Sequence, residues 1–127
     1  MFIKYNPNPT GKKTGDCVVR SLCKALGKSW DEVYKGLCDV GFTMKLMPSA
    51  NEVWQSVLLQ YGFKKQPYKI VKGSKRATVQ LCSLSNPLST CVVSVANHLV
   101  CTKDGNYYDT FDSGGCCVYS IFSRLNK

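Results

Sequence analysis

The sequence predicts an α+β fold, with helices in the first half of the chain and an antiparallel sheet in the second. Capping residues, apolar positions at helical spacing and terminating glycines fill residues 16–62. From residue 90 onward, short runs rich in Val, Cys, Tyr and Ile alternate with turn residues, as strands do. A chain of 127 residues has the size of one domain. We therefore expect a single domain, 1–127, whose N-terminal helices pack on a C-terminal antiparallel β-sheet.

The first helix is the most clearly marked element. Residues 1–15 are rich in Pro, Gly and Asn, which predicts an irregular leader. Asp16 is then a good N-cap for a helix over residues 17–26, and Gly27 is a good terminator.

Two capping boxes predict the next two helices. Ser29–Glu32 opens a helix that should run to about residue 38, before Gly41. Ser49–Glu52 opens another that should reach about residue 60. The large aromatic residues at helical spacing here are expected to be core: Trp30, Tyr34, Phe42 and Trp54.

The second half of the chain reads as short elements. Asp104-Gly105 lies between two strand-like runs and is a strong hairpin signal. We expect a strand over 68–71, a short helix over 78–84, and strands over 90–96, 99–103, 106–111 and 116–122.

Composition bears on several classes of function. The formal net charge is +9, but the basic residues are scattered and form no basic helix with interleaved aromatics, so nucleic-acid binding is not favoured. The eight cysteines include no C-x-x-C pair, and one histidine cannot complete the usual zinc patterns, so we expect free thiols, no metal and no cofactor. No signal-peptide pattern and no long apolar run is present, which predicts a cytoplasmic protein without membrane contact.

Cys17 is placed where a reactive thiol would be expected. On a helical projection it lies opposite the apolar stripe that contains Cys23, on the same side as Arg20, which we interpret as a solvated charge or as a group that steers an acidic substrate. A helix start also lowers the pKa of a thiol, because unpaired N–H groups and the helix dipole favour the thiolate.

His98 is the one candidate for a base that activates this thiol. The hairpin at Asp104-Gly105 brings the next strand back beside it. With a three-residue loop, His98 faces Asp112; with a two-residue loop, it faces Phe111, and both Asp109 and Asp112 are near. We prefer Asp112 as the group that orients the imidazole and keep Asp109 as the alternative.

These residues resemble those of small papain-like cysteine peptidases found in bacteria and phages. The likeness is carried by Thr14–Arg20, Gly27–Tyr34, Asn97–Val100 and Tyr108–Gly114, and so extends over nearly the whole chain. It implies a papain-like fold in which Cys17 is the nucleophile, His98 the base and Asp112 the orienting residue. Such peptidases place a Gln shortly before the cysteine as an oxyanion donor. The leader has none, and Asn8 or Asn6 is expected in its place.

The resulting functional hypothesis is thiol-dependent acyl transfer, most simply hydrolysis of a peptide or isopeptide bond in a peptide or protein substrate. The alternative hypothesis is a catalytically silent papain-fold binding module of phage type, whose partner would be a host defence or regulatory protein. A phage-encoded chain would act in the cytoplasm of the host cell.

Overall fold

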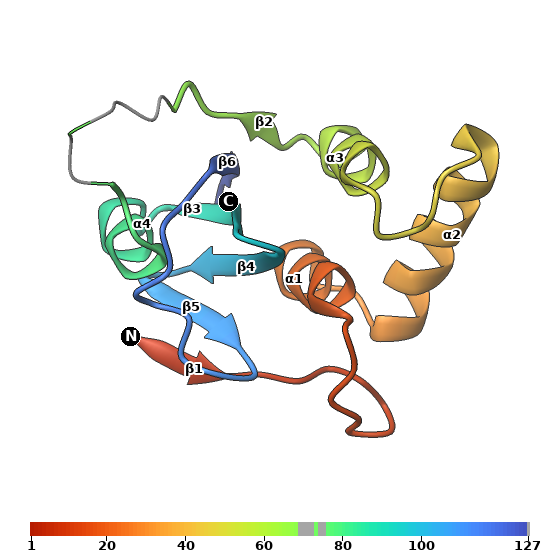
Figure 1. Cartoon of the computed structure of the whole chain (residues 1–127), viewed down its shortest axis with the longest axis horizontal. Helices are drawn as coiled ribbons and strands as arrows, with labels where there is room; N and C mark the ends of the chain where they lie inside the picture. The colour runs from red at the N-terminus through yellow and green to blue at the C-terminus, as the bar shows by residue number, and fades with distance from the viewer. Residues whose placement is uncertain (69–72, 74–75, 127) are drawn as a thin grey trace.

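The computed structural model describes residues 1–68, 73 and 76–126. Within these ranges, four helices and six strands follow in the predicted overall order, helices before most of the sheet (Figure 1). The helices are α1 (Cys17–Leu26), α2 (Trp30–Met44), α3 (Asn51–Gln60) and α4 (Val79–Ser85). The strands are β1 (Phe2–Lys4), β2 (Lys64–Lys65), β3 (Ser89–Val95), β4 (His98–Lys103), β5 (Asn106–Asp109) and β6 (Ser120–Leu125). The α+β class is therefore confirmed.

The strands form one sheet in the order β1-β5-β4-β3-β6-β2. All neighbouring strands are antiparallel except β1 and β5, which are parallel and pair Phe2 with Tyr107. The sheet is therefore mixed rather than antiparallel as predicted. The start of the leader was wrongly predicted to be irregular, because a three-residue strand that pairs with a segment a hundred residues away carries almost no local signal.

A two-residue turn joins β4 to β5 and fixes their register. Asp104 and Gly105 have φ angles of 54° and 79°, so both adopt the left-handed conformation that the tightest hairpins require. Lys103 consequently pairs with Asn106, and the pairing continues to Cys101 with Tyr108. This register corresponds to the shorter of the two loops considered from the sequence. It determines which aspartate lies on the same face as His98.

Both faces of the sheet are covered (Figure 1). On one face, α1, α2 and α3 pack in a single buried cluster with Val92, Leu99 and Phe122 of the sheet. On the other, the short α4 buries Val79 and Cys82 against Val93 and Val100. Because strand side chains alternate between faces, neighbouring residues of β3 and β4 belong to different layers.

Helix α1 has the predicted limits, and Gly27 ends it in the left-handed conformation at φ 66°. Asp16 stands at the N-cap position, but its side chain caps nothing. It instead accepts hydrogen bonds from the guanidinium of Arg20 and from the indole N–H of Trp30. Asp16, which the sequence predicted to be a helix cap, is therefore part of a buried polar network.

The next two helices each match one predicted end, α2 at its start and α3 at its stop. The Ser29–Glu32 capping box is complete, whereas Ser49 caps nothing and α3 starts after Ala50. Helix α2 runs through Gly41 to Met44, well past the predicted end. Gly41 is a close-packing position, not a stop, because a Cβ there would lie 2.7 Å from the carbonyl oxygen of Leu46.

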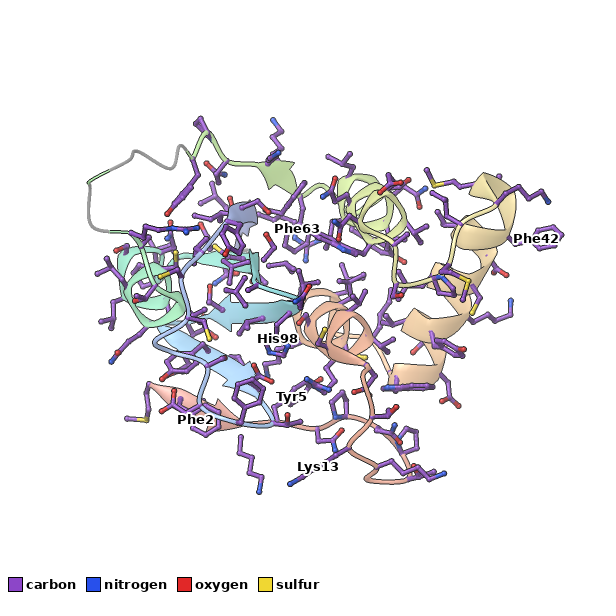
Figure 2. The ribbon with its side chains drawn as sticks, in the orientation of Figure 1. Phe2, Tyr5, Lys13, Phe42, Phe63 and His98 are labelled. Carbon is purple, nitrogen blue, oxygen red and sulfur yellow. The ribbon has the colours of Figure 1, made fainter. Side chains whose placement is uncertain are left out.

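Other predictions need smaller corrections. The last strand begins at Ser120 instead of residue 116. Of the strand expected over residues 68–71, only Tyr68 belongs to the described residues, and it is not in a strand. Trp54 is core as expected, but Tyr34 and Phe42 lie exposed on α2, and Phe42 points away from the body of the molecule (Figure 2).

No helix in the described ranges combines the length and the apolar character that a membrane crossing would need.

Candidate active site

The sulfur of Cys17 and the ring of His98 line the same cavity. Cys17 is the first residue of α1, and His98 is the first residue of β4, which lies beneath that end of the helix (Figure 2). The cavity measures about 480 Å³, opens to the surface and is also lined by α3 and by the turn between β3 and β4. The two residues that the sequence singled out, 81 positions apart, thus meet at one site.

The Cys17 thiol is half-buried and its pKa is lowered. Burial by itself would raise this pKa, since it disfavours the thiolate. Hydrogen bonding from His98 and from the Leu99 backbone N–H, together with the charges of His98 and Arg20, outweighs that effect. The environment therefore favours the nucleophilic thiolate.

The imidazole of His98 is held between Cys17 and Asp109. Its Nε2 lies 2.6 Å from Oδ2 of Asp109, so Nδ1 is the nitrogen left for the thiol. The Phe111 ring lies 5.1 Å from the imidazole, centroid to centroid, as the two-residue turn requires. Burial lowers the pKa of His98, but Asp109 and Cys17 raise it more, to about 9. The surroundings therefore favour a protonated imidazole and an ionised thiol in the same site.

Asp109 is the carboxylate that contacts His98 in the structure, so the preference for Asp112 as its partner was wrong. Asp109 is 2% exposed at the end of β5 and lies on the same face of the hairpin as His98. Its Oδ2 also accepts from the Ser113 hydroxyl at 2.8 Å, and its Oδ1 accepts from the Thr110 backbone N–H at 2.8 Å. Burial raises the pKa of Asp109, but these hydrogen bonds and the charge of His98 lower it overall.

Asp112 is held elsewhere by its own contacts. Its Oδ1 accepts from the Tyr107 hydroxyl at 2.6 Å and from the Gly114 backbone N–H at 3.0 Å. Only glycine fits at position 114, since a Cβ there would lie 2.3 Å from the Tyr107 hydroxyl oxygen. Asp112 thus closes the loop after β5 and makes no contact with His98 among its hydrogen bonds. With the two-residue loop both aspartates were expected near His98, and the one on the same face of the hairpin, Asp109, makes the contact.

The buried side chain of Arg20 is linked to this site through Asp109. It is only 7% exposed, and its guanidinium pairs with Asp16 and, at 3.3 Å, with Oδ1 of Asp109. The prediction of a solvated or substrate-steering charge was wrong. Its side chain points inward because two buried carboxylates surround it, and one of them is 89 residues away in the sequence. The single available signal was local: Asp16 and Arg20 stand four positions apart, one helical turn.

The two asparagines proposed as oxyanion donors are engaged in the leader. The Asn6 amide donates to the carbonyl oxygens of Gly11 and Lys12, and the Asn8 side-chain oxygen accepts from Thr10. Neither lines the cavity that holds Cys17 and His98. The structure instead offers the backbone N–H of Cys17, which lies in the first turn of α1, where helical N–H groups have no partner within the helix.

Several of the remaining thiols differ from Cys17 in that their pKa values are raised. Burial raises the pKa of Cys23 to about 12 and that of Cys82 to about 11, and also raises that of Cys91. All eight cysteines lie within the described residues and are free. Within the same part of the chain, no group of three or more His, Cys, Asp or Glu side chains could hold a metal ion.

The Cys17–His98–Asp109 arrangement has the parts that nucleophilic acyl transfer requires. It combines a thiol with a lowered pKa, a base that can return a proton, and a carboxylate that fixes the tautomer of that base. Comparison of the chain with protein-family models, with curated proteins and with solved structures found no match.

Proposed function

We propose that the protein is a thiol-dependent acyl-transfer enzyme that hydrolyses peptide or isopeptide bonds, with a papain-like fold. The observation that carries the proposal is that Cys17 and His98 line one cavity while His98 Nε2 lies 2.6 Å from Oδ2 of Asp109. The resemblance to papain-like peptidases implies the same order of elements, with the cysteine on a helix that packs against antiparallel strands bearing the histidine and the carboxylate. The Asp of the triad is Asp109, in place of Asp112.

The reaction begins with attack of the Cys17 thiolate on the substrate carbonyl carbon. The carbonyl oxygen takes the negative charge and accepts a hydrogen bond from the Cys17 backbone N–H. The carbon–nitrogen bond then breaks, and the leaving amine takes the proton that His98 carries. The products of this half are a free amine and a thioester between the substrate acyl group and Cys17.

The second half uses His98 as a base. Water enters the place of the amine and gives one proton to the neutral imidazole while its oxygen attacks the thioester carbon. The carbon–sulfur bond breaks, a carboxylic acid leaves, and the thiolate–imidazolium pair forms again. Asp109 stays ionised throughout and holds the Nε2 proton, so that Nδ1 always faces the sulfur.

Alkylation and peptide hydrolysis together test this proposal. We expect iodoacetamide at pH 6–7 to modify Cys17 much faster than a free cysteine, because the lowered pKa of Cys17 raises the fraction of thiolate. We also expect cleavage of an unbiased pool of internally quenched peptides to disappear in Cys17→Ser. The matched control is Cys38→Ser, since Cys38 is also half-buried but does not line this cavity. Slow alkylation of Cys17, or cleavage that survives Cys17→Ser, would refute the proposal.

A catalytically silent binding module is the second candidate, and one observation favours it. Neither leader asparagine reaches the cavity, so the leader supplies no side-chain oxyanion donor. This candidate predicts that a host protein binds wild type and Cys17→Ser equally well, and that no peptide in the pool is cleaved by either.

A further inference from the structure

Four leucine side chains lie exposed on the side of the sheet that α4 covers. Leu81 and Leu84 belong to α4, Leu88 lies in the turn that follows it, and Leu125 is the last residue of β6. Their exposed fractions run from 53% to 75%. Soluble proteins seldom leave several large apolar side chains together on one surface unless that surface binds something.

The two leucines of α4 point away from the sheet. Val79 and Cys82 of this helix are buried against the sheet, whereas Leu81 and Leu84, three positions apart, share the outer face. Both leucines line a cavity of about 470 Å³, and Arg76 lines it as well. The outer face of α4 is therefore hollowed, with apolar walls and a cation at one end.

The other two leucines continue this side of the molecule at the end of the sheet. The backbone N–H of Asn126 donates to the carbonyl oxygen of Leu88 at 2.8 Å, and Ser89 pairs with Leu125. Ser89 is two positions from Cys91, which packs in the cluster under α4, and side chains two positions apart on a strand face the same way. Leu125 therefore faces the α4 side and lies beside Leu88.

Arg76 is held in place by its neighbours. Its Nη2 donates to the carbonyl oxygen of Val118 at 3.2 Å, and its guanidinium carbon lies 4.5 Å from the centroid of the Tyr119 ring. An arginine held in this way loses little further freedom when a carboxylate binds to it. It is therefore well prepared to recognise an acidic side chain.

The charge of this part of the chain favours an acidic partner. The segment 53–103, which includes α4, β3 and β4, contains seven Lys or Arg residues and no Asp or Glu. Asp104 lines a cavity together with Leu125, but Lys103 and Arg124 line the same cavity, so the net charge there is also positive. Like charges would oppose the docking of a second copy of this chain, whereas an acidic partner would be attracted.

We propose that this surface, which we name the α4 surface (Arg76, Leu81, Leu84, Leu88 and Leu125), binds an acidic segment of another protein in which large apolar residues are interspersed with Asp or Glu. Apolar side chains of the partner pack on the leucines, and one of its carboxylates pairs with Arg76. The hollow beside α4 and the fixed guanidinium fit a polypeptide of defined shape better than a fluid membrane surface. The phosphates of a nucleic acid would leave the leucines uncovered.

This inference goes beyond the proposed function and does not depend on it. Helix α4 packs on the opposite side of the sheet from α1, which carries Cys17 (Figure 1). A partner can therefore bind to the α4 surface whether or not Cys17 is catalytically active.

Selection from a displayed library of random 16-residue peptides tests the α4 surface without assuming a sequence. We expect the peptides that wild type enriches to combine Asp or Glu with large apolar residues. The most enriched peptide is then synthesised, and fluorescence anisotropy gives its Kd. Replacing its acidic residues by Gln, or its apolar residues by Ala, should each weaken binding by at least about tenfold, because each change removes one of the two complementary features.

Two variants change the α4 surface, and a third is the matched control. Leu84→Glu places a like charge against the acidic peptide and should weaken its binding by at least about tenfold. Arg76→Gln should weaken it by about tenfold. Leu59→Glu is the control, because Leu59 is 56% exposed, close to the 60% of Leu84, but lies on α3 across the sheet. It should bind as wild type does, and circular dichroism checks that all three variants fold.

The remaining outcomes overturn the inference. They are enriched peptides without acidic residues, no enriched peptide at all, and peptide binding that Leu84→Glu does not weaken. Binding of wild type to phosphatidylserine vesicles or to duplex DNA, or a dimer in sedimentation velocity, overturns it as well if Leu84→Glu abolishes that association. Cys17→Ser should bind the selected peptide as wild type does, so failure of the α4 surface and failure of the proposed function are distinguishable.

Discussion

Two regions of the molecule contain cysteines and shift the pKa of the thiols in opposite directions. At the start of α1, Cys17 lies beside His98, and its pKa is lowered. In the centre of the sheet, Cys91 and Cys101 lie on β3 and β4 with no exposed surface, and their pKa values are raised. The residue type is the same, and the chain is the same.

The difference lies in what surrounds each thiol. The sheet interior is apolar, so a thiolate there would lose its hydration without compensation. Under Cys17, by contrast, four ionisable side chains are linked by hydrogen bonds: His98, Asp109, Arg20 and Asp16. Burial opposes the thiolate in both regions, and only the region around Cys17 offsets the effect of burial. The reactivity of a thiol in this fold therefore depends on its neighbours as well as on its depth.

Removing the central carboxylate should have the largest effect on this contrast. In Asp109→Asn, the guanidinium of Arg20 and the ring of His98 lose a shared anionic partner inside the protein. Breaking a buried pair in this way costs about 3–5 kcal/mol, so we expect the free energy of unfolding to fall by that amount. Urea unfolding monitored by tryptophan fluorescence measures it.

Asp112→Asn is the matched control for that change. The exposed Asp112 contacts Tyr107 and Gly114 and no cation among its hydrogen bonds. We expect a loss of about 1 kcal/mol or less. Equal losses in the two variants would contradict the central position given to Asp109.

Removing the imidazole should make Cys17 resemble the sheet cysteines. In His98→Ala, burial acts on the thiol without its strongest opposing hydrogen bond, so its pKa rises. The iodoacetamide rate at pH 7 should fall by about tenfold for each unit by which the new pKa of Cys17 exceeds 7. Mass spectrometry of the modified peptide gives the rate, and Cys101 serves as the internal reference. An unchanged rate would show that the reactivity of Cys17 does not depend on His98.

The pH dependence of stability offers a sharper test, because two opposing contributions are expected. Between about pH 6.5 and 9, folded His98 keeps a proton that the unfolded chain has released, so stability falls as pH rises. Over the upper part of the same interval, folded Cys17 has lost a proton that the unfolded chain keeps, so stability rises with pH. The two contributions oppose each other in wild type.

Cys17→Ala should therefore expose the contribution of His98. Asp109 still raises the pKa of the imidazole in this variant, so we expect its free energy of unfolding, relative to wild type, to decrease as the pH rises from 6.5 to 9. Urea unfolding at five pH values measures the difference, and other titrating groups cancel in it. A difference that does not vary with pH would show that the thiolate–imidazolium pair does not form.

A helix cap outside both regions should give the smallest effect. Ser29→Ala removes the hydroxyl that accepts from the Glu32 backbone N–H at 3.2 Å and leaves the Cys17 site untouched. We expect a loss of about 1 kcal/mol in stability and no change in the alkylation rate of Cys17. A slower alkylation rate would mean that α2 and the active site are coupled.

The sequence predicted best what depends on nearby residues. The limits of α1, the Ser29–Glu32 capping box and the Asp104-Gly105 turn are local features, and the structure has all three. Cys17 and His98 could be chosen because one stands outside an apolar stripe and the other is the single histidine of the chain.

What the sequence missed depends on distant partners. Strand β1 exists because it pairs with β5, which follows it by about a hundred residues. Arg20 is buried because Asp109 lies beside it, and a helical projection counts any arginine as a surface residue. The choice between Asp109 and Asp112 depended on one residue of loop length, which the Asp-Gly signal alone does not determine.

That turn has a consequence for how such a protein can change over generations. Loss of the Gly105 codon, with a two-residue turn formed again by Asp104 and Asn106, would slide β5 by one place and turn each of its side chains to the opposite layer. Asp109 would leave the imidazole, and Asp112, three positions later, would come closer to it. Lineages could thus exchange one supporting acid for another through a length change in a surface turn, with Cys17, His98 and both aspartates left unmutated.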